Sequence, residues 1–266
     1  MGVDLDYAPP EIAPAVELVG AGSRVDGRTL IDDVPLAVPR GSILAVTGLD
    51  GSGKSALLNL MSTLVRPSAG AVRLFGRDTE AVGEEGRRAL RLEIGVVFEE
   101  GGLLDGFTVG ENVELPLARR GLPRAELAAR AERWLAELQM VAYRDYLPSQ
   151  LSMGLTRRAA LARALAAEPR LLICDEVTTG LDLPSILAFS RLFRRLRTQK
   201  GVTIVMTVAD LAEIRRVADA VAVLQAGRLA FHGDLALLTE RRLHDPVLRD
   251  LFDDESWSIV FPSGPP

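Results

Sequence analysis

The sequence contains one cysteine, so the chain cannot form an internal disulfide bond. Cys174 lies in the apolar run Leu171–Cys174, where a small buried thiol is expected rather than a nucleophile. The chain also lacks the run of about eighteen apolar residues that a membrane-spanning helix requires. Its N-terminus lacks the basic and then apolar order of a secretory signal. We therefore expect a cytoplasmic protein, with any membrane role peripheral.

Net positive charge is absent as well. The chain carries 31 Lys and Arg residues against 36 Asp and Glu residues, which gives a formal net charge of −5. No overall positive field draws such a chain onto a polyanion, so we expect no nucleic-acid partner. One basic cluster occurs on a predicted helix that opens at Pro184, and we interpret it as a solvated face. It consists of Arg191, Arg194, Arg195 and Arg197.

What the chain does contain is a series of short apolar runs. Short apolar runs that alternate with Gly, Asp and Pro from Val16 to Thr47 predict an antiparallel sheet. Ser42–Thr47 is instead continuously apolar, which is typical of a strand buried on both faces of a parallel sheet. Helical patterns separate the runs and predict an α/β fold with a mostly parallel sheet. Four later runs resemble Ser42–Thr47: Ile94–Phe98, Leu171–Cys174, Val202–Thr207 and Ala220–Leu224.

The segment from Gly110 to Ala167 has a different composition. It is rich in Ala, Leu, Arg and Glu and has no β-branched runs, so it is predicted to be helical. One apolar stripe recurs at steps of three and four residues, with Arg and Glu opposite it. The stripe consists of Leu127, Ala131, Trp134, Leu135 and Leu138. We interpret the segment as an inserted helical subdomain.

A glycine-rich loop follows the first fully apolar run and leads into a helical pattern over Lys54–Val65. Glycines let the backbone N–H groups of such a loop turn inward, where the helix N-terminus adds its own unpaired donors. We predict that the loop binds phosphates, that Lys54 neutralises β- and γ-phosphate oxygens, and that Ser55 places a hydroxyl on Mg²⁺. The alternative is a chance glycine-rich turn. The predicted contact residues are Gly48, Leu49, Asp50, Gly51, Ser52, Gly53, Lys54, Ser55 and Ala56.

Two carboxylates follow a later apolar run, at Asp175 and Glu176. In an open α/β sheet ligands bind beyond the carboxyl ends of the strands, so Asp175 is expected beside the phosphate loop, holding Mg²⁺ through water. Glu176, one residue further, is expected to act as the base that polarises the attacking water. Taken alone, such a pair is most often a turn. Beside a phosphate loop it predicts ATP hydrolysis.

The order of the motifs resembles that of the ABC ATPase family. The phosphate loop is followed by Val97–Glu99, then by Leu151–Leu155, then by Cys174–Glu176 and finally by Thr179–Asp182. The resemblance covers residues 16 to 252 and implies a P-loop NTPase (RecA-like) core that binds ATP and Mg²⁺. It also implies a head-to-tail dimer of two ABC ATPase subunits, homo- or heteromeric, with ATP between the phosphate loop of one and the signature loop of the other.

Further site residues come only from this resemblance. Glu99 stands where the family has a glutamine that senses Mg²⁺, and Val25 stands where an aromatic ring stacks on adenine. Ser152 and Gly154 would contact the γ-phosphate held by the partner subunit. A groove near Leu103, Leu104 and Phe107 would receive a membrane permease on the cytoplasmic face of the inner membrane. The alternative for those three residues is that they belong to the core.

The resemblance also predicts how the chain is divided. Residues 1–15 would form a leader, residues 16–252 a single ABC ATPase domain, and residues 253–266 a tail. Within the domain, the catalytic core would comprise residues 16–98 and 168–235. The helical subdomain would comprise residues 99–167, and a C-terminal helical segment residues 236–252.

Several family positions carry different chemistry here. Glu99 is an anion in place of a neutral amide, and Met153 replaces a glycine of the signature loop. Ala209 replaces a histidine that contacts the γ-phosphate, and alanine has no donor. Val177 replaces a proline after the catalytic glutamate, while His232 and His244 lie too late in the chain to substitute for the missing histidine. We expect ATP binding with weak hydrolysis by a homodimer.

Within the family, several stretches look most like the subunits of Mla- and Mce-type lipid transporters. They are Gly101–Leu104, Asn112–Leu117, Arg157–Ala164 and Asp245–Phe252. The leading hypothesis is therefore a transport ATPase that acts on a permease for lipid. A second hypothesis is a nucleotide-sensing subunit paired with an active ATPase. A third class, soluble ABC proteins of translation or DNA repair, usually has two cassettes or a long coiled coil, and this sequence has neither.

Overall fold

The computed structural model describes residues 13–118 and 123–251. Of the predicted leader, residues 1–12 lie outside the described residues, as does the whole of the predicted tail, 253–266. Among the residues described, no helix has the length and apolarity needed to cross a membrane. The elements follow one another in this order: β1 (Val16–Val25), β2 (Arg28–Val38), β3 (Ile43–Thr47), α1 (Lys54–Met61), β4 (Ala69–Leu74), β5 (Arg77–Asp78), α2 (Gly83–Arg91), β6 (Ile94–Val97), α3 (Val109–Ala118), α4 (Arg124–Glu137), η1 (Val141–Tyr143), η2 (Pro148–Gln150), α5 (Met153–Ala166), β7 (Leu171–Cys174), α6 (Leu183–Lys200), β8 (Thr203–Thr207), α7 (Leu211–Val217), β9 (Ala220–Gln225), β10 (Arg228–Gly233), α8 (Leu235–Arg242) and α9 (Pro246–Leu251).

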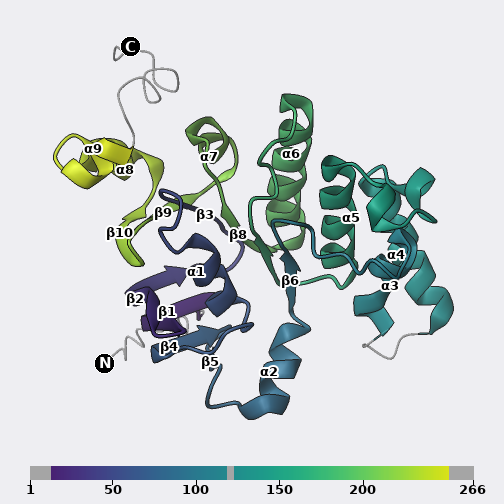
Figure 1. Cartoon of the computed structure of the whole chain (residues 1–266), viewed down its shortest axis with the longest axis horizontal. Helices are drawn as coiled ribbons and strands as arrows, with labels where there is room; N and C mark the ends of the chain where they lie inside the picture. The colour runs from purple at the N-terminus through teal and green to yellow at the C-terminus, as the bar shows by residue number, and fades with distance from the viewer. Residues whose placement is uncertain (1–12, 119–122, 252–266) are drawn as a thin grey trace, which may run out of the picture.

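A six-stranded sheet forms the centre of the molecule, with strand order β10-β9-β3-β8-β7-β6 (Figure 1). Strands β9, β3, β8, β7 and β6 are parallel to one another, and only β10 runs antiparallel at the edge. The five predicted apolar runs are these five parallel strands, and every residue of β3 is buried. The predicted α/β fold is therefore confirmed, because continuous apolar runs suit strands covered on both faces.

A second, antiparallel sheet has the order β2-β1-β4-β5. Strands β1 and β2 were expected from their alternation, but β4 and β5 were not. The β4 sequence begins Ala69-Gly70, which are weak strand formers, so its local signal is poor. It forms a strand because β1 offers it a partner, with Val16 opposite Leu74 and Leu18 opposite Val72.

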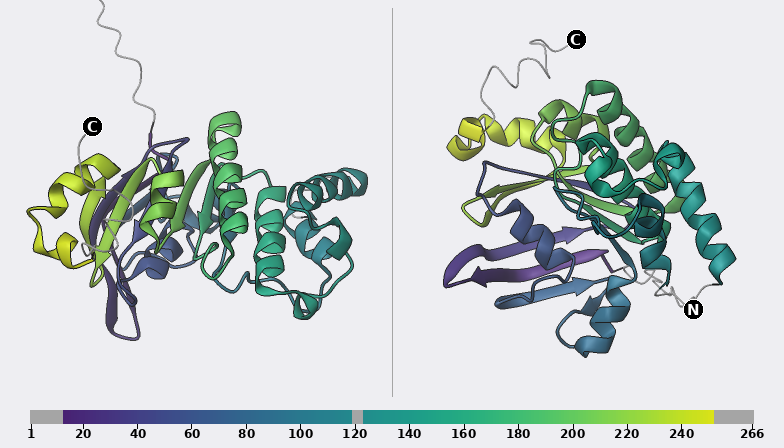
Figure 2. Two further views of the ribbon diagram at one scale, coloured as in Figure 1. Left: turned by 90° about the horizontal axis from the view of Figure 1, so that it is seen from above. Right: turned by 45° about the vertical axis from the view of Figure 1, so that its right-hand side comes forward.

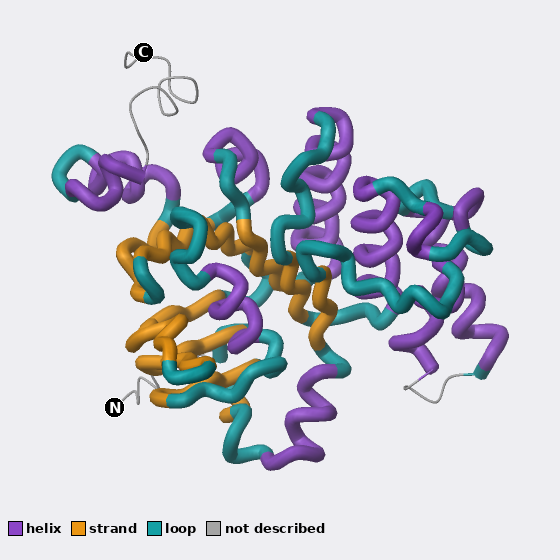
Figure 3. The backbone as a smooth tube through the Cα atoms, in the orientation of Figure 1, coloured by secondary structure: helices purple, strands orange, loops and turns teal. Residues whose placement is uncertain are grey.

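Helix α1 lies between the two sheets, as Figure 1 and the tube in Figure 3 show. Its buried side chains Leu57, Leu58, Leu60 and Met61 belong to a core that also contains apolar residues of both sheets. The helix ends at Met61 rather than at the predicted Val65. The correction has a local cause, because Thr63 takes the left-handed conformation with φ of 60° and turns the chain out of the helix.

Helices α5, α6 and α7 cover the other face of the parallel sheet and share its second core. Helices α3, α4 and α5 form a group beyond the β6 edge, shown in teal in Figure 2. In the predicted apolar stripe, Ala131, Trp134, Leu135 and Leu138 are buried and Leu127 packs against them. These helices lie within residues 99–167, although the subdomain boundaries themselves stay a prediction.

The basic cluster on α6 is a solvent-facing surface with specific partners. Arg191, Arg194 and Arg195 are exposed, as predicted. Arg195 pairs with Glu137 of α4, and Arg197 pairs with Asp219 at 2.8 Å. Helix α6 begins with the Asp182 carboxylate accepting the Ser185 N–H, so the start signal near Pro184 was correctly read.

Candidate functional site

The loop between β3 and α1 depends on glycine at two positions. At Gly48 φ is 145°, and an added Cβ would lie 2.2 Å from the carbonyl oxygen of Leu224. At Gly53 φ is 104°, and an added Cβ would lie 2.8 Å from the carbonyl oxygen of Leu30. Gly53 is also the N-cap of α1 and supplies no side-chain cap. The first N–H groups of α1 therefore remain available to an anion.

Lys54 and Ser52 give the same loop its polar groups. The Lys54 ammonium donates to the carbonyl oxygens of Gly48 at 2.9 Å and Leu49 at 3.1 Å. The Ser52 hydroxyl is buried and has no hydrogen-bond partner in the part of the chain that the structure describes. A loop with an inward-folded ammonium, an unpaired buried hydroxyl and no room for a side chain at Gly48 fits the phosphate group predicted for it.

The turn between β9 and β10 supports the loop, and sequence reasoning missed it. The Gly227 N–H donates to the Ser52 carbonyl at 2.9 Å, and the Gly227 carbonyl accepts the Asp32 N–H at 2.9 Å. Arg228 of the same turn pairs with Asp32 at 2.5 Å. The loop is thereby joined to β2 of the antiparallel sheet. The only local signal was Ala226-Gly227, a glycine turn that could end any hairpin.

The two predicted carboxylates follow β7, and a threonine from the neighbouring strand positions them. The Thr207 hydroxyl donates to Asp175 Oδ1 at 2.9 Å and accepts the Glu176 backbone N–H at 2.7 Å. Thr207 is buried at the end of β8, and β8 lies between β3 and β7 in the sheet. Glu176 has φ of 47°, a conformation that a non-glycine residue adopts only when its surroundings impose it. Gly48, Thr207 and Asp175 thus end or follow three adjacent strands.

Glu99 lies at the same edge of the sheet but further from the loop. It is exposed and follows β6, which pairs with β7 on the side away from β3. The described residues contain no group of three or more His, Cys, Asp or Glu side chains able to hold a metal ion. A Mg²⁺ site that uses Ser55, Asp175 and Glu99 would suit an ion that keeps several waters and binds substrate phosphates as well.

Of three further predicted contact residues, Ser152 and Gly154 lie away from the loop within the chain, and Val25 lies on the β1–β2 hairpin. Val25 is 44% exposed at the tip of the β1–β2 hairpin. Ser152 caps α5, where its hydroxyl accepts the Leu155 N–H at 3.4 Å, and Gly154 is in the first turn. Helix α5 packs on α3, α4 and β6, whereas α1 packs on β1, β2, β4 and β8. The single chain therefore does not bring Ser152 or Gly154 to its own phosphate loop.

The structure shows where the residues lie that differ from the family pattern. Met153 is 55% exposed, and its methyl group would lie 3.1 Å from a Cβ added at Gly180. Ala209 is exposed just beyond the end of β8. His232 lies on the edge strand β10 and His244 follows α8, so neither stands at the ends of β3, β7 or β8.

Helix α7 contributes one buried acid that sequence reasoning did not single out. The Glu213 Oε2 atom accepts the Thr178 hydroxyl at 2.9 Å, and its Oε1 atom is buried with no partner within residues 13–118 and 123–251. Burial raises the pKa of Glu213, and the Asp210 charge adds to this. Thr178 follows Glu176 by two residues, so Glu213 holds the chain segment that leaves the carboxylates.

The predicted permease groove has exposed apolar side chains. Leu104 and Phe107 are each 42% exposed, so the alternative that they belong to the core is wrong for these two residues, while Leu103 is partly buried. A cleft of about 290 Å³ is lined by Gly102, Leu103 and Pro148 among others. Arg163 of α5 donates to the carbonyls of Gly101 at 3.0 Å and Gly102 at 2.5 Å, which fixes this loop.

Comparison with known families gives a match to one family, described as ABC transporter, over residues 31–179. Among curated proteins, the methionine import ATP-binding protein MetN of Caulobacter vibrioides is 41% identical over 207 residues, which cover 78% of this chain and 62% of that protein. MetN of Xanthomonas axonopodis pv. citri is 39% identical over 222 residues, covering 83% and 65%. The chain thus spans less than two thirds of the length of these relatives.

Solved structures agree with the fold. The ATP-binding cassette MJ0796, described as a dimer in a post-hydrolysis state bound to ADP and Pi, matches with a TM-score of 0.77 and 28% identity, covering 83% of this chain and 98% of that chain. CbiO1 of Clostridium perfringens, described as part of the ABC transporter complex cbiONQ, matches with a TM-score of 0.74 and 25% identity, covering 90% and 99%. The predicted P-loop NTPase fold with an antiparallel N-terminal sheet is therefore confirmed.

Proposed function

The matched family spans more than half of the chain, so this protein belongs to the ABC transporter family, and from that premise we propose that it binds Mg-ATP and couples ATP binding and hydrolysis to a membrane permease. The proposal is supported most by one arrangement. The Gly48–Ser55 loop, with Lys54 folded into it, shares an edge of the sheet with an Asp175 that Thr207 orients. Phosphoryl transfer of this kind requires a loop that binds the phosphates and an acidic residue at the end of a neighbouring strand.

We assign each residue a role from its chemistry. Backbone N–H groups from Gly48 to Ala56 bind the phosphates, and Lys54 moves from its carbonyl partners to phosphate oxygens. Ser55 and Glu99 would hold Mg²⁺ through their side-chain oxygens and Asp175 would hold it through water, and the ion would neutralise charge on the phosphates. Glu176 is the base that accepts a proton from the attacking water. Val25 gives apolar contact to adenine without a ring face.

We propose that ATP is enclosed between two subunits. Ser152 and Gly154 are remote from the loop of their own chain, which favours a site that they complete in a partner. The similar MJ0796 cassette is a dimer in its solved structure, and this supports the same arrangement. Met153 would enter that contact beside them. A permease would dock at Leu103, Leu104 and Phe107, where apolar side chains are exposed, and this would hold the chain at the membrane surface.

We propose that turnover by the homodimer is slow. Ala209 offers no hydrogen-bond donor to the γ-phosphate, and the loss of one such donor typically costs roughly a hundred- to a thousandfold in rate. Binding should survive, because Lys54, Ser55 and Asp175 are retained. Comparing turnover of this chain alone and mixed with an ABC subunit of complete motifs distinguishes a weak ATPase from a nucleotide-sensing partner.

The cargo proposal changes in the light of the relatives. The named relatives are methionine import subunits, which favours an amino acid over a lipid as the cargo of the transporter in which this chain works. The lipid prediction is left without support among them. Uptake of labelled methionine by cells with and without this chain tests the amino-acid proposal, and unchanged uptake would contradict it.

Calorimetric titration of the folded protein with Mg-ATP tests the core of the proposal. We expect saturable heat with a dissociation constant in the micromolar to millimolar range typical of such substrates. A flat titration in folded protein would contradict ATP binding. Steady-state turnover of the homodimer above roughly one per second would leave binding intact but contradict the slow-turnover proposal.

A further inference from the structure

A cleft of about 520 Å³ opens at the amino ends of β7 and β8. The phosphate loop and Asp175 lie at the carboxyl ends of the same parallel sheet, so the cleft is on the opposite edge. Its lining comes from segments far apart in the chain. Arg40 lies between β2 and β3, Phe75 between β4 and β5, Trp134 on α4, Arg170 just before β7, and Lys200 at the end of α6.

The lining is positive in a chain whose net charge is −5. Three cationic side chains, Arg40, Arg170 and Lys200, face one carboxylate, Glu168. Glu168 is bound by Arg130 at 3.1 Å and Arg133 at 2.6 Å. Burial opposes its ionisation, but the Arg133 hydrogen bond and nearby positive charges, including that of Lys200, lower its pKa. The negative charge of Glu168 is therefore already compensated by Arg130 and Arg133.

Two of the three cations have no carboxylate partner among the described residues. Arg170 pairs with Glu93 at 2.5 Å. Arg40 donates only to carbonyl oxygens, to Ala13 at 2.8 Å and to Phe75 at 3.4 Å. Lys200 makes no ion pair within 4.0 Å in the described part of the chain, and its ammonium lies 4.9 Å from the centre of the Trp134 ring. The cleft thus retains positive charge that a ligand can neutralise.

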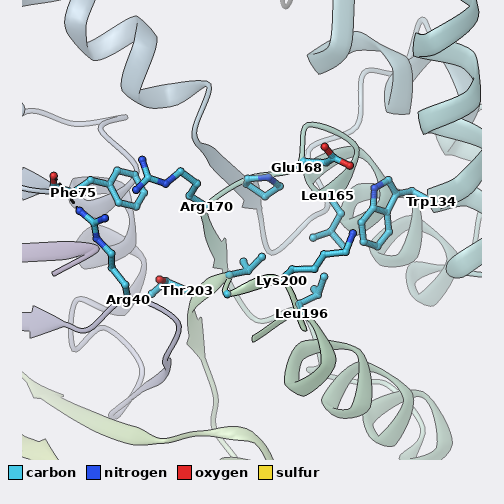
Figure 4. Close-up of a pocket in the computed structure, with 12 residues that line it drawn as sticks. Arg40, Phe75, Trp134, Leu165, Glu168, Arg170, Leu196, Lys200 and Thr203 are labelled. Atoms are coloured by element: carbon cyan, nitrogen blue, oxygen red, sulfur yellow. Dashed lines mark hydrogen bonds between the residues drawn. The ribbon is translucent and has the colours of Figure 1, made fainter. Parts of the chain in front are cut away.

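Trp134 adds an unused hydrogen-bond donor. The residue is 4% exposed, and its indole Nε1 is buried and has no hydrogen-bond partner among the described residues. Figure 4 shows Lys200 reaching toward the Trp134 ring on one side of the cleft, with Arg40 and Arg170 around Phe75 on the other. A buried N–H normally has an acceptor, and the Lys200 ammonium lies over the face of the same ring, so an acceptor at this N–H would be in the field of a positive charge, which favours an anion.

Lys200 is also unusual in this chain. Lysine occurs only at positions 54 and 200 of the sequence, and arginine supplies every other strong cation. An ammonium is a compact charge on a flexible stem, whereas a guanidinium is a flat fork that pairs readily with carboxylates. One lysine is in the phosphate loop, and the other lines this cleft. The apolar side chains Leu165, Leu196 and Val202 form the rest of the lining near it.

We propose that this cleft binds a small organic anion, a carboxylate or a phosphate ester with a short apolar body. Its charged group lies beside Lys200 and accepts a hydrogen bond from the Trp134 indole, in the field of Arg40 and Arg170. Its apolar body lies against the wall of the cleft to which Leu165 and Leu196 contribute. This site is separate from the nucleotide site and does not rest on ATP binding.

Trp134 fluorescence tests the proposal directly, because the only other tryptophan, Trp257, can be replaced by phenylalanine. The full-length Trp257→Phe protein, with excess Mg-ATP present to fill the phosphate loop, is titrated with butyl phosphate, butyrate, inorganic phosphate and butanol. We expect a saturable emission change with butyl phosphate or butyrate, weaker binding of inorganic phosphate and no saturation with butanol. The proposal is overturned if neither organic anion saturates the emission change up to about ten millimolar, because any dissociation constant would then lie above that concentration. Equal affinity for inorganic phosphate overturns the assignment of an organic ligand.

A pair of charge-removing variants on α6 separates this site from general electrostatics. In the same background, Lys200→Gln should weaken binding about tenfold or more, because a charge-assisted contact is lost. Arg191→Gln, which removes an exposed charge from the same helix outside the cleft, should leave the affinity unchanged. Equal weakening by both variants would overturn the proposal, and so would no weakening by Lys200→Gln.

Discussion

The parallel strands end at two opposite edges of the sheet, a carboxyl edge where their C-terminal ends lie and an amino edge where their N-terminal ends lie. Polar groups are arranged differently at these two edges. At the carboxyl edge, eight consecutive residues from Gly48 to Ser55 supply the proposed phosphate loop, and Asp175 and Glu176 are adjacent in sequence. At the amino edge, the cleft draws single residues from separate segments, with Arg40, Trp134 and Lys200 far apart in the chain. Backbone groups need a continuous stretch of chain, whereas side chains can converge from anywhere. The first kind of site is readable from sequence, and the second is not.

The largest expected effect falls on the carboxyl edge. Lys54→Ala should weaken Mg-ATP binding by more than about a hundredfold and prevent ATP-dependent dimer closure, because charge-assisted bonds to phosphate are lost. Stability should change little, since in the free chain the Lys54 ammonium donates to two loop carbonyls and its 3.8 Å ion pair is with the fully exposed carboxylate of Asp50. Calorimetry and sedimentation with ATP measure both. Unchanged affinity would count against the assignment of this edge.

Ala209→His addresses the missing donor at the same edge. Position 209 is exposed beyond β8, so the larger side chain can be accommodated. We expect turnover to rise by roughly tenfold to a hundredfold, with the dissociation constant for ATP nearly unchanged, because the new donor acts on charge that develops in the transition state. Steady-state phosphate release gives the rate. A rate equal to that of the parent would show that Ala209 is not what limits hydrolysis.

Thr203 and Thr207 lie at opposite ends of the same strand, β8. The same substitution at each of them therefore compares the two edges. Thr207→Val removes the hydroxyl that joins Asp175 to the Glu176 N–H, and Thr203→Val removes one that accepts the Gly41 N–H at 2.9 Å. Both are buried, so each should cost about 1–3 kcal/mol in the free energy of unfolding. Only Thr207→Val should also lower turnover, by about tenfold, and raise the Mg²⁺ concentration needed for half-maximal rate. Equal effects on turnover would contradict a positioning role for Thr207.

The buried carboxyl group of Glu213, near the carboxyl edge, should make the free energy of unfolding depend on pH. Burial raises its pKa in the folded chain above the ordinary value of 4.5. At pH values between the ordinary pKa and the raised pKa of the folded chain, the folded state holds a proton that the unfolded state has lost. The free energy of unfolding therefore falls as pH rises through that window. Glu213→Gln removes this proton but keeps an acceptor for Thr178. Denaturant midpoints measured from pH 4.5 upward should decline more steeply for the parent chain than for the variant, and parallel curves would contradict the prediction.

The smallest effect is expected at the amino edge. Arg170→Gln removes an ion pair with Glu93 and a cation–π contact with Phe75 at 4.2 Å. Arg170 is half exposed and Glu93 keeps Arg77 as a partner, so the loss should be about 1 kcal/mol or less and smaller at high salt. ATP affinity should not change. A tenfold change in ATP affinity would show that the two edges are energetically coupled.

Sequence reasoning reached the strongly patterned elements and missed those that depend on partners. It found β3, β6, β7, β8 and β9 because continuous apolar runs signal buried strands. It missed β4 and β10, whose sequences gain strand character only from β1 and β9 beside them. It extended α1 to Val65 because the left-handed turn at Thr63 has no strong local signature. The lipid prediction gained no support, because the relatives named above are described as methionine import proteins.

The sequence by itself determined the glycine-rich loop Gly48–Ser55, the buried strands around it and the apolar stripe of α4, because each depends on residues close together in the chain. Only the tertiary structure decided that β8 lies between β3 and β7, and so that Thr207 orients Asp175 and Glu176. It also decided that Lys200 lies over Trp134 with its charge unpaired in the described chain. Strand order and the convergence of distant side chains come from packing the whole core, and no short stretch of sequence encodes them.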